Sequence, residues 1–274
     1  GAVMGATDVS MNTNAVIVEK LAGRRLLSGM HAFWSIGCFA SAGLFSVLAS
    51  SGLDVTLIAT LHCAIVLALL AVFGRHLLDY KSPGGEKAFA IPRGIVIVLG
   101  ILACISFLVE GAVMDWSGVL LTEVKNMDIA LAGTGYAIFS VAMLIMRLLG
   151  DKTVQFLGEQ KAVIGGSIVT AAGFALVVIA DNLYLNAFAF ILIGLGCANI
   201  VPVFYSLLKY QKDMPISAAV TSVTSLGYTG VILGPALLGF VAHGINISAV
   251  FELVALLLVI EAGIAKYVFC KLKM

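Results

Sequence analysis

Asp8, Asn12 and Glu110 are polar side chains that lie inside long apolar stretches of this 274-residue sequence. Asp8 and Asn12 are four residues apart and therefore share one face of a helix. A carboxylate at the centre of a bilayer costs about 2.5–3.5 kcal/mol on insertion scales, so it should face a cavity or a partner. Such a group can bind and release a proton or contact a polar solute. The alternative is that it only hydrogen-bonds a neighbouring helix.

The composition predicts a membrane protein. The sequence is 61% hydrophobic and only 11% charged. Each of its apolar segments is close to the ~20 residues that a helix needs to cross ~30 Å of hydrocarbon. Backbone groups that face lipid must be satisfied within their own segment, which favours helices. We therefore expect an all-α polytopic membrane helix bundle with spans at 2–19, 28–50, 53–74, 95–119, 129–149, 162–180, 183–208, 216–240 and 246–268.

The basic residues predict the orientation of these spans. Every Lys and Arg except Lys125 falls in alternate gaps between the apolar segments or near the C-terminus. Short loops rich in Lys and Arg stay on the cytoplasmic side. This pattern places the Lys81–Lys87 loop and the C-terminus in the cytoplasm, and the turn with Lys125 outside. The basic residues are thus explained by topology, and we expect no nucleic-acid partner.

The sequence lacks the motifs of common enzymes and metal sites. It contains no H-E-x-x-H, no P-loop and no nucleophile elbow. Its five cysteines are scattered singly, without metal-ligand or redox spacing. We therefore expect no enzymatic activity, no cofactor and no bound metal.

A polar stretch at 75–94 divides the chain into three spans before it and six after it. Met30–Gly37 and Val220–Gly227 are similar and both follow a basic loop, which favours a parallel repeat of six helices. In that repeat, 1–74 ends an N-terminal half, 75–94 is a cytoplasmic linker and 95–274 is the C-terminal half. Since the first segment would then be a fourth helix, we expect the sequence to be a fragment that lacks N-terminal helices.

Six motifs stand at matching places in the six-plus-six topology: Thr7–Asn12 and His31–Gly37 (helices four and five), Phe107–Ser117 (helix seven), Arg147–Lys152 (the loop after helix eight), and Gly194–Pro202 and Gly227–Pro235 (helices ten and eleven). With this topology and these motifs, the sequence resembles the major facilitator superfamily. The first two motifs resemble its fucose–proton symporter branch, and Phe107–Ser117 resembles helix seven of uncharacterised bacterial relatives of that branch. The resemblance implies that about nine of twelve helices are present in a monomeric alternating-access transporter, whose halves rock about a midplane site.

The resemblance implies roles for several polar residues. The fucose branch has a functional carboxylate on helix four, which implies that Asp8 binds the coupled proton. A sugar-contacting Gln stands in that branch where this sequence has His31, so His31 is a candidate solute contact. A structural role remains open for Asp8, His31 and Glu110. The candidates for lining the substrate cavity are Asn12, His31, Glu110, Asn199 and Tyr228.

Arg147, Gly150, Asp151 and Lys152 are expected to form a charged turn between two spans. In the resembling family, such a turn latches helices together through a charge relay in one state of the cycle. Plain topology explains the Arg and the Lys equally well, but it does not explain Asp151. These four residues are therefore candidates for a conformational latch.

These observations predict a secondary active transporter in the cytoplasmic (inner) membrane. It would move a small polar solute such as a sugar by alternating access, coupled to protons, with membrane lipid as its surroundings. One alternative is a proton-coupled exporter of amphipathic compounds, and another is a transporter-like sensor that binds solute without moving it. The interior carboxylates, His31 and Asn12 favour a polar solute over an amphipathic one.

Overall fold

The computed structural model describes residues 2–78 and 91–272, and these form helices without any strand. This confirms the predicted all-α class. Most of the predicted linker, including Lys81–Lys87, lies outside the described residues. The helices are α1 (Ala2–Ala22), α2 (Leu27–Ser50), α3 (Val55–Phe73), α4 (Ile95–Val119), α5 (Thr134–Leu157), α6 (Glu159–Ile179), α7 (Leu183–Cys197), α8 (Ile200–Leu207), α9 (Ile216–Gly244) and α10 (Ile247–Leu272), with short turns η1 (Gly74–His76), η2 (Leu120–Val124) and η3 (Ile129–Leu131).

Eight stretches among the described residues are long and apolar enough to cross a membrane, against nine expected from the sequence. One of the eight, Leu183–Leu207, is made by α7 and α8 together, so the predicted span at 183–208 is interrupted in its middle. α1 has 21 residues but is not one of the eight. Its middle carries Asp8, Asn12 and Asn14, which lower its hydropathy below that of the other helices.

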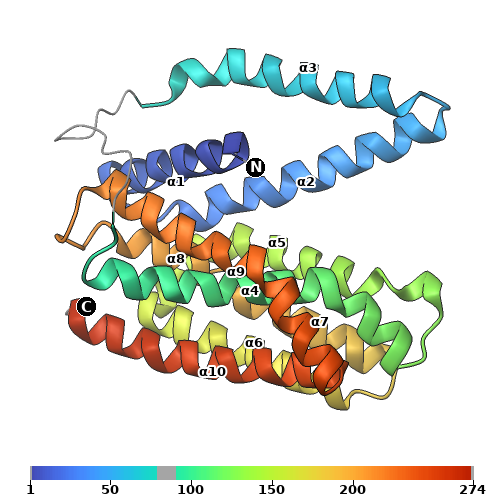
Figure 1. The fold of residues 1–274 in the computed structure, drawn as a ribbon. Helices are drawn as coiled ribbons and strands as arrows, with labels where there is room; N and C mark the ends of the chain where they lie inside the picture. The colour runs from blue at the N-terminus through green and yellow to red at the C-terminus, as the bar shows by residue number, and fades with distance from the viewer. Residues whose placement is uncertain (1, 79–90, 273–274) are drawn as a thin grey trace.

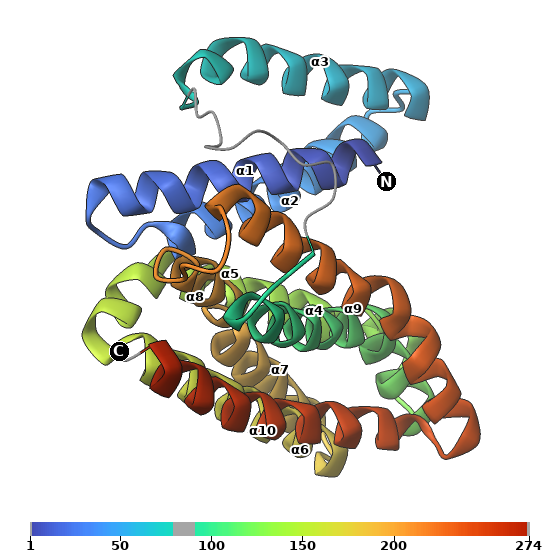
Figure 2. The same cartoon turned by 60° about the vertical axis from the view of Figure 1, so that its left-hand side comes forward.

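The helices form two groups. The amino-terminal group (α1–α3) lies along one side of the carboxy-terminal group (α4–α10), as Figures 1 and 2 show. Within the carboxy-terminal group α4 packs along α9, and α6 packs against both α7 and α10. Gly230 allows the first of these contacts, because a Cβ atom there would collide with the Cys104 carbonyl oxygen. Membrane helices commonly use small residues in this way to approach each other closely.

The carboxylate of Glu261 is buried inside the carboxy-terminal group. Glu261 of α10 is 0% exposed, and its two oxygens accept hydrogen bonds from Ser106 of α4 at 2.6 Å and Ser167 of α6 at 3.0 Å. These bonds connect three helices, in the way that polar side chains stabilise membrane bundles.

The turns rich in Lys and Arg gather at one end of the molecule, here called the basic end. The α1–α2 turn, the α8–α9 turn and the end of α10 lie there, at the left of Figure 1. The α2–α3, α4–α5 and α9–α10 turns lie at the opposite end. Lys125, the one basic residue predicted on the other side, follows η2 there and donates to the Val178 carbonyl oxygen at 2.6 Å.

The charged turn predicted at 150–152 is instead part of a helix. α5 continues through Gly150, Asp151 and Lys152 and ends at Leu157. The glycine that stops it is Gly158, whose φ of 82° lies in the left-handed region that favours glycine. The prediction was wrong because the Arg147–Lys152 motif was matched to the loop after helix eight, whereas Gly150 lies within α5 and serves a close packing contact described below.

Candidate functional site

The first turn of α2 cannot cap itself. The residue at the N-cap position is Leu26, whose side chain has no hydrogen-bond acceptor. The first N–H groups of a helix have no partner within the helix and need one from elsewhere. Glu19 of α1 is one of these outside partners: its Oε2 accepts hydrogen bonds from the backbone N–H groups of Leu26 at 3.0 Å and Leu27 at 3.1 Å.

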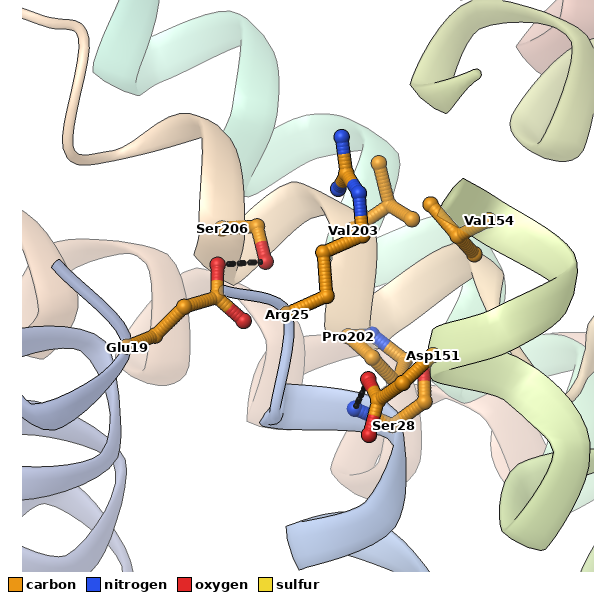
Figure 3. Close-up of a pocket in the computed structure, with 8 residues that line it drawn as sticks. All are labelled: Glu19, Arg25, Ser28, Asp151, Val154, Pro202, Val203 and Ser206. Carbon is orange, nitrogen blue, oxygen red and sulfur yellow. Dashed lines mark hydrogen bonds between the residues drawn. The ribbon is translucent and has the colours of Figure 1, made fainter. Parts of the chain in front are cut away.

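The next two N–H groups of α2 are capped by a residue of the other group. Asp151 of α5 accepts from the N–H of Ser28 at 3.1 Å through Oδ1 and from that of Gly29 at 2.9 Å through Oδ2. Figure 3 shows this carboxylate aimed at the start of α2. The positive end of the α2 dipole favours the negative charge at this position. Asp151 therefore binds the two helix groups to each other through the α2 N-terminus.

Glycines on both helices permit this contact. A Cβ atom on Gly29 would lie 2.8 Å from Asp151 Oδ2. One on Gly150 would lie 2.6 Å from Ser28 Cβ and would collide with Asn199 Oδ1. Gly150 and Gly29 thus let α2 and α5 approach closely enough for the carboxylate to reach the backbone.

Ion pairs surround the capped helix end. Arg25 Nη1 lies 2.7 Å from Glu159 Oε1, which begins α6. Glu19 Oε1 lies 2.9 Å from Lys209 Nζ and accepts from Ser206 Oγ at 2.6 Å. Glu19 and Glu159 are buried, so these bonds are formed largely away from water. The basic-end closure consists of Glu19, Arg25, Ser28, Gly29, Asp151, Glu159, Ser206 and Lys209.

Of the four residues predicted to form the latch, Asp151 belongs to this closure and Gly150 packs against Ser28 beside it. Lys152 is exposed to solvent. Arg147 lies one helical turn deeper and contacts other residues. Sequence reasoning missed Arg25 and Glu159, since ion pairs between residues 134 positions apart leave no local pattern. The available signal was Leu26, an apolar residue at a helix start that needs outside caps.

Arg147 connects three elements in the interior. It is 6% exposed. Its Nη2 donates to Glu110 of α4 at 3.1 Å, its Nη1 to Ser35 of α2 at 3.4 Å, and its Nε to the Ala198 carbonyl oxygen at 3.3 Å. Ala198 lies in the break between α7 and α8, where the helix interruption leaves its carbonyl available. The structure thus brings Glu110 and Arg147 together, which the sequence did not predict.

Asp8 lies on the other side of this interior. It is half-buried and within hydrogen-bonding reach of Tyr228 on α9 and of Asn12 on its own helix. Asn12 is 3% exposed and donates to the Asp8 carbonyl oxygen at 3.0 Å. Three of the predicted site residues, Asp8, Asn12 and Tyr228, are therefore neighbours.

The other two predicted residues lie on the α7–α8 side. The ring centre of His31 is 5.9 Å from that of Tyr205, whose hydroxyl is 2.8 Å from Thr224 Oγ1. His31 Nε2 is buried, and no hydrogen bond to it is found among the described residues. The side-chain oxygen of Asn199 is also buried without a partner and lies against Gly150. Asn199 thus packs beside the closure.

No cluster of three or more His, Cys, Asp or Glu residues suited to a metal ion occurs within 2–78 and 91–272. The polar groups between the two helix groups are instead hydrogen-bond donors, acceptors and single charges. Such groups can bind and orient a polar solute, exchange protons, and form or break contacts when the groups move.

Comparison with known proteins identifies relatives along almost the whole chain, although no family model matches it. An uncharacterized MFS-type transporter of Yersinia pestis is 40% identical over 269 residues, which are 98% of this chain and 70% of that protein. The human organic anion transporter MFSD10 has a TM-score of 0.75 at 13% sequence identity, and the match covers 94% of this chain and 67% of the MFSD10 chain. The Escherichia coli fucose:proton symporter FucP has a TM-score of 0.64 at 13% sequence identity, and the match covers 88% of this chain and 68% of the FucP chain.

The two solved structures are too distant in sequence to show more than the fold, but the first relative shows kinship. The sequence is 40% identical to that relative over nearly the whole chain. The helix bundle also has the same fold as the two solved transporters. The superfamily that the motifs indicated is confirmed. This multi-pass membrane protein belongs to the major facilitator superfamily of transporters.

Proposed function

We propose that this protein is a secondary active transporter that moves a small polar solute across the cytoplasmic membrane by alternating access, coupled to protons. The observation that carries this proposal is the basic-end closure. It fastens two helix groups to each other at one end through contacts that can be broken without unfolding either group.

The lengthwise distribution of contacts supports a rocking mechanism. Asp151, Arg25 and Glu19 connect the groups at the basic end. Toward the opposite end, α2 diverges from the carboxy-terminal group in both views, and most side chains of residues 39–50 are exposed. If the basic end faces the cytoplasm, as the Lys and Arg pattern predicts, the described conformation is closed on the cytoplasmic side.

Asp8 is the residue that we propose carries the coupled proton. It lies between α1 and α9, one helix from each group, and its partner Tyr228 is neutral. A carboxylate without a cationic partner in a membrane interior is costly when charged, and a proton removes that charge. Protonation of Asp8 would also change its bond to Tyr228 and thus the contact between the groups.

The test is transport by the protein in liposomes with an imposed pH gradient. Asp8→Asn keeps the size and hydrogen bonding of the side chain but removes the titratable group. We expect it to abolish pH-driven accumulation while equilibrative exchange of the same solute continues. Full pH-driven accumulation by the variant would leave Asp8 with a structural role only.

The same assay separates the two alternatives. A sensor would bind solute in a thermal-shift assay but show neither uptake nor counterflow in liposomes. An exporter of amphipathic compounds would need an apolar, aromatic binding region. The interior contacts described above are instead built from carboxylates, an amide, an imidazole and a guanidinium, which favours the polar solute.

A further inference from the structure

Arg147 is a buried cation whose contact with its carboxylate partner is long. Its Nη2 lies 3.1 Å from Glu110 Oε1, whereas bonds between a guanidinium and a carboxylate are typically about 2.7–2.9 Å long. Glu110 touches it through one oxygen only. The side chain of Glu110 is 27% exposed, compared with 7% for Arg147. The carboxylate can therefore leave, while the guanidinium is held in place.

The surroundings hold Arg147 from both helix groups. Nε is fixed by the Ala198 carbonyl oxygen at the break between α7 and α8, and Nη1 reaches Ser35 of α2. Interrupted membrane helices commonly supply the backbone groups of substrate and ion sites. An arginine presents five N–H donors in a planar fork that suits a two-oxygen anion. Three of these donors are used by residues that the structure describes, which leaves two N–H groups of the fork for a ligand.

We propose that Arg147 binds the carboxylate of a small organic acid, which takes the place of Glu110, and that Glu110 accepts a proton when it is displaced. The inference deepens the proposed function and rests on it, since it names the class of solute. Glu110 itself shows that the fork accepts a carboxylate. The single positive charge of Arg147 is balanced here by the single negative charge of Glu110. A ligand that takes the place of Glu110 should therefore also carry one negative charge, which favours a monocarboxylate over a phosphate dianion.

The proton follows from the charges that face this pair. His31 of α2 and Cys197 of α7 lie within electrostatic range of it. Two other acids in the interior have neutral partners: Asp8 lies within hydrogen-bonding reach of Tyr228 of α9, and Glu261 of α10 accepts hydrogen bonds from two serines. Among the described residues none of these groups offers Glu110 a second cation. A displaced Glu110 would be an unpaired carboxylate in the membrane, and a proton from the aqueous side would neutralise it.

Binding to the purified protein tests the proposal with matched probes. Gluconate and sorbitol differ in one carboxylate, as do glucuronate and glucose, and acetate serves as a minimal carboxylate. We expect the carboxylates, but not their neutral counterparts, to raise the melting temperature. Arg147→Gln should weaken carboxylate binding by about tenfold or more, because a charged pair is lost. Arg75→Gln removes the same charge from an exposed site and should change nothing.

The pH dependence of binding provides a second readout, which remains if Arg147→Gln fails to fold. Uptake of one proton per anion predicts that the wild-type dissociation constant rises by about tenfold per pH unit over the pH range in which binding takes up that proton. Glu110→Gln should bind at least as tightly, because the competitor is gone. Measured in an Asp8→Asn background, which removes the other proposed proton site, the affinity of Glu110→Gln should no longer vary with pH. A retained pH slope in this double variant, or equal stabilisation by neutral and acidic probes, would overturn the proposal.

Transport distinguishes this inference from the proposed function. Proton-driven uptake of glucose without any effect of gluconate would leave a transporter but reject the carboxylate site. Carboxylate binding that is lost in Arg147→Gln, with no transport in liposomes, would keep the site but reject the transporter.

Discussion

Asp151→Asn should open the basic end of the molecule. The amide can still accept one N–H of α2, but the variant loses the charge and the second acceptor. Hydrogen bonds to charged groups contribute about 1.5–3 kcal/mol each, and a charge at a helix N-terminus contributes up to ~2 kcal/mol. Since the amide recovers part of this, we estimate a loss of about 2 kcal/mol. That corresponds to roughly thirtyfold in the equilibrium between the closed and open basic end.

Cysteine labelling measures this equilibrium. Val154 is 2% exposed and lines the space around Asp151 and Arg25 in Figure 3. Val154→Cys, in a background without the five native cysteines, should react with a maleimide only when the two groups part. We expect Asp151→Asn to raise the labelling rate in detergent by about thirtyfold, if labelling occurs from the open population.

Asp54→Asn is the matched control for this experiment. Asp54 also caps a helix, accepting from the N–H of Thr56 at 2.8 Å, but this contact lies within the amino-terminal group at the opposite end. The same charge is removed without touching the closure, so the labelling rate should not change. A labelling rate for Asp151→Asn within twofold of this control would refute the reasoning.

Two further predictions concern packing and the core. Gly29→Ala should weaken the closure, because the new Cβ lies 2.8 Å from Asp151 Oδ2, and the same labelling assay should detect it. Gly37→Ala on the same helix meets nothing within 4 Å and is its control. Glu261→Ala should lower the unfolding free energy in detergent by about 1–3 kcal/mol, because two interhelical hydrogen bonds are lost. Glu252→Ala, an exposed change on the same helix, should be neutral, and equal effects of the two variants would contradict the assigned role.

The fold could be predicted well from the sequence because membrane helices can be recognised by the length and hydropathy of their segments alone. The boundaries of α5 were an exception. Gly150 and Gly158 look alike in a sequence, yet only Gly158 has the left-handed backbone that ends the helix. Gly150 is small because α2 and Asn199 press against it, and that requirement exists only in three dimensions.

The candidate site was less predictable. Asp8 and Glu110 could be found because a buried acid is conspicuous in an apolar stretch. The partners of these acids, Tyr228 and Arg147, could not be predicted, because they lie on other helices and each had several possible neighbours. Arg147 was assigned to the latch because it is near Asp151 in sequence. One turn of helix was enough to place it against a different set of residues.

The shared capping of α2 has a spectroscopic consequence. Two of its first amide protons, those of Leu26 and Leu27, are held by Glu19 from the same helix group. The next two, those of Ser28 and Gly29, are held by Asp151 from across the interface. Amide exchange with deuterium should therefore accelerate for Ser28 and Gly29 each time the basic end opens, while Leu26 and Leu27 stay protected. Four consecutive amides thus contain both a reporter of the opening of the basic end and its internal reference.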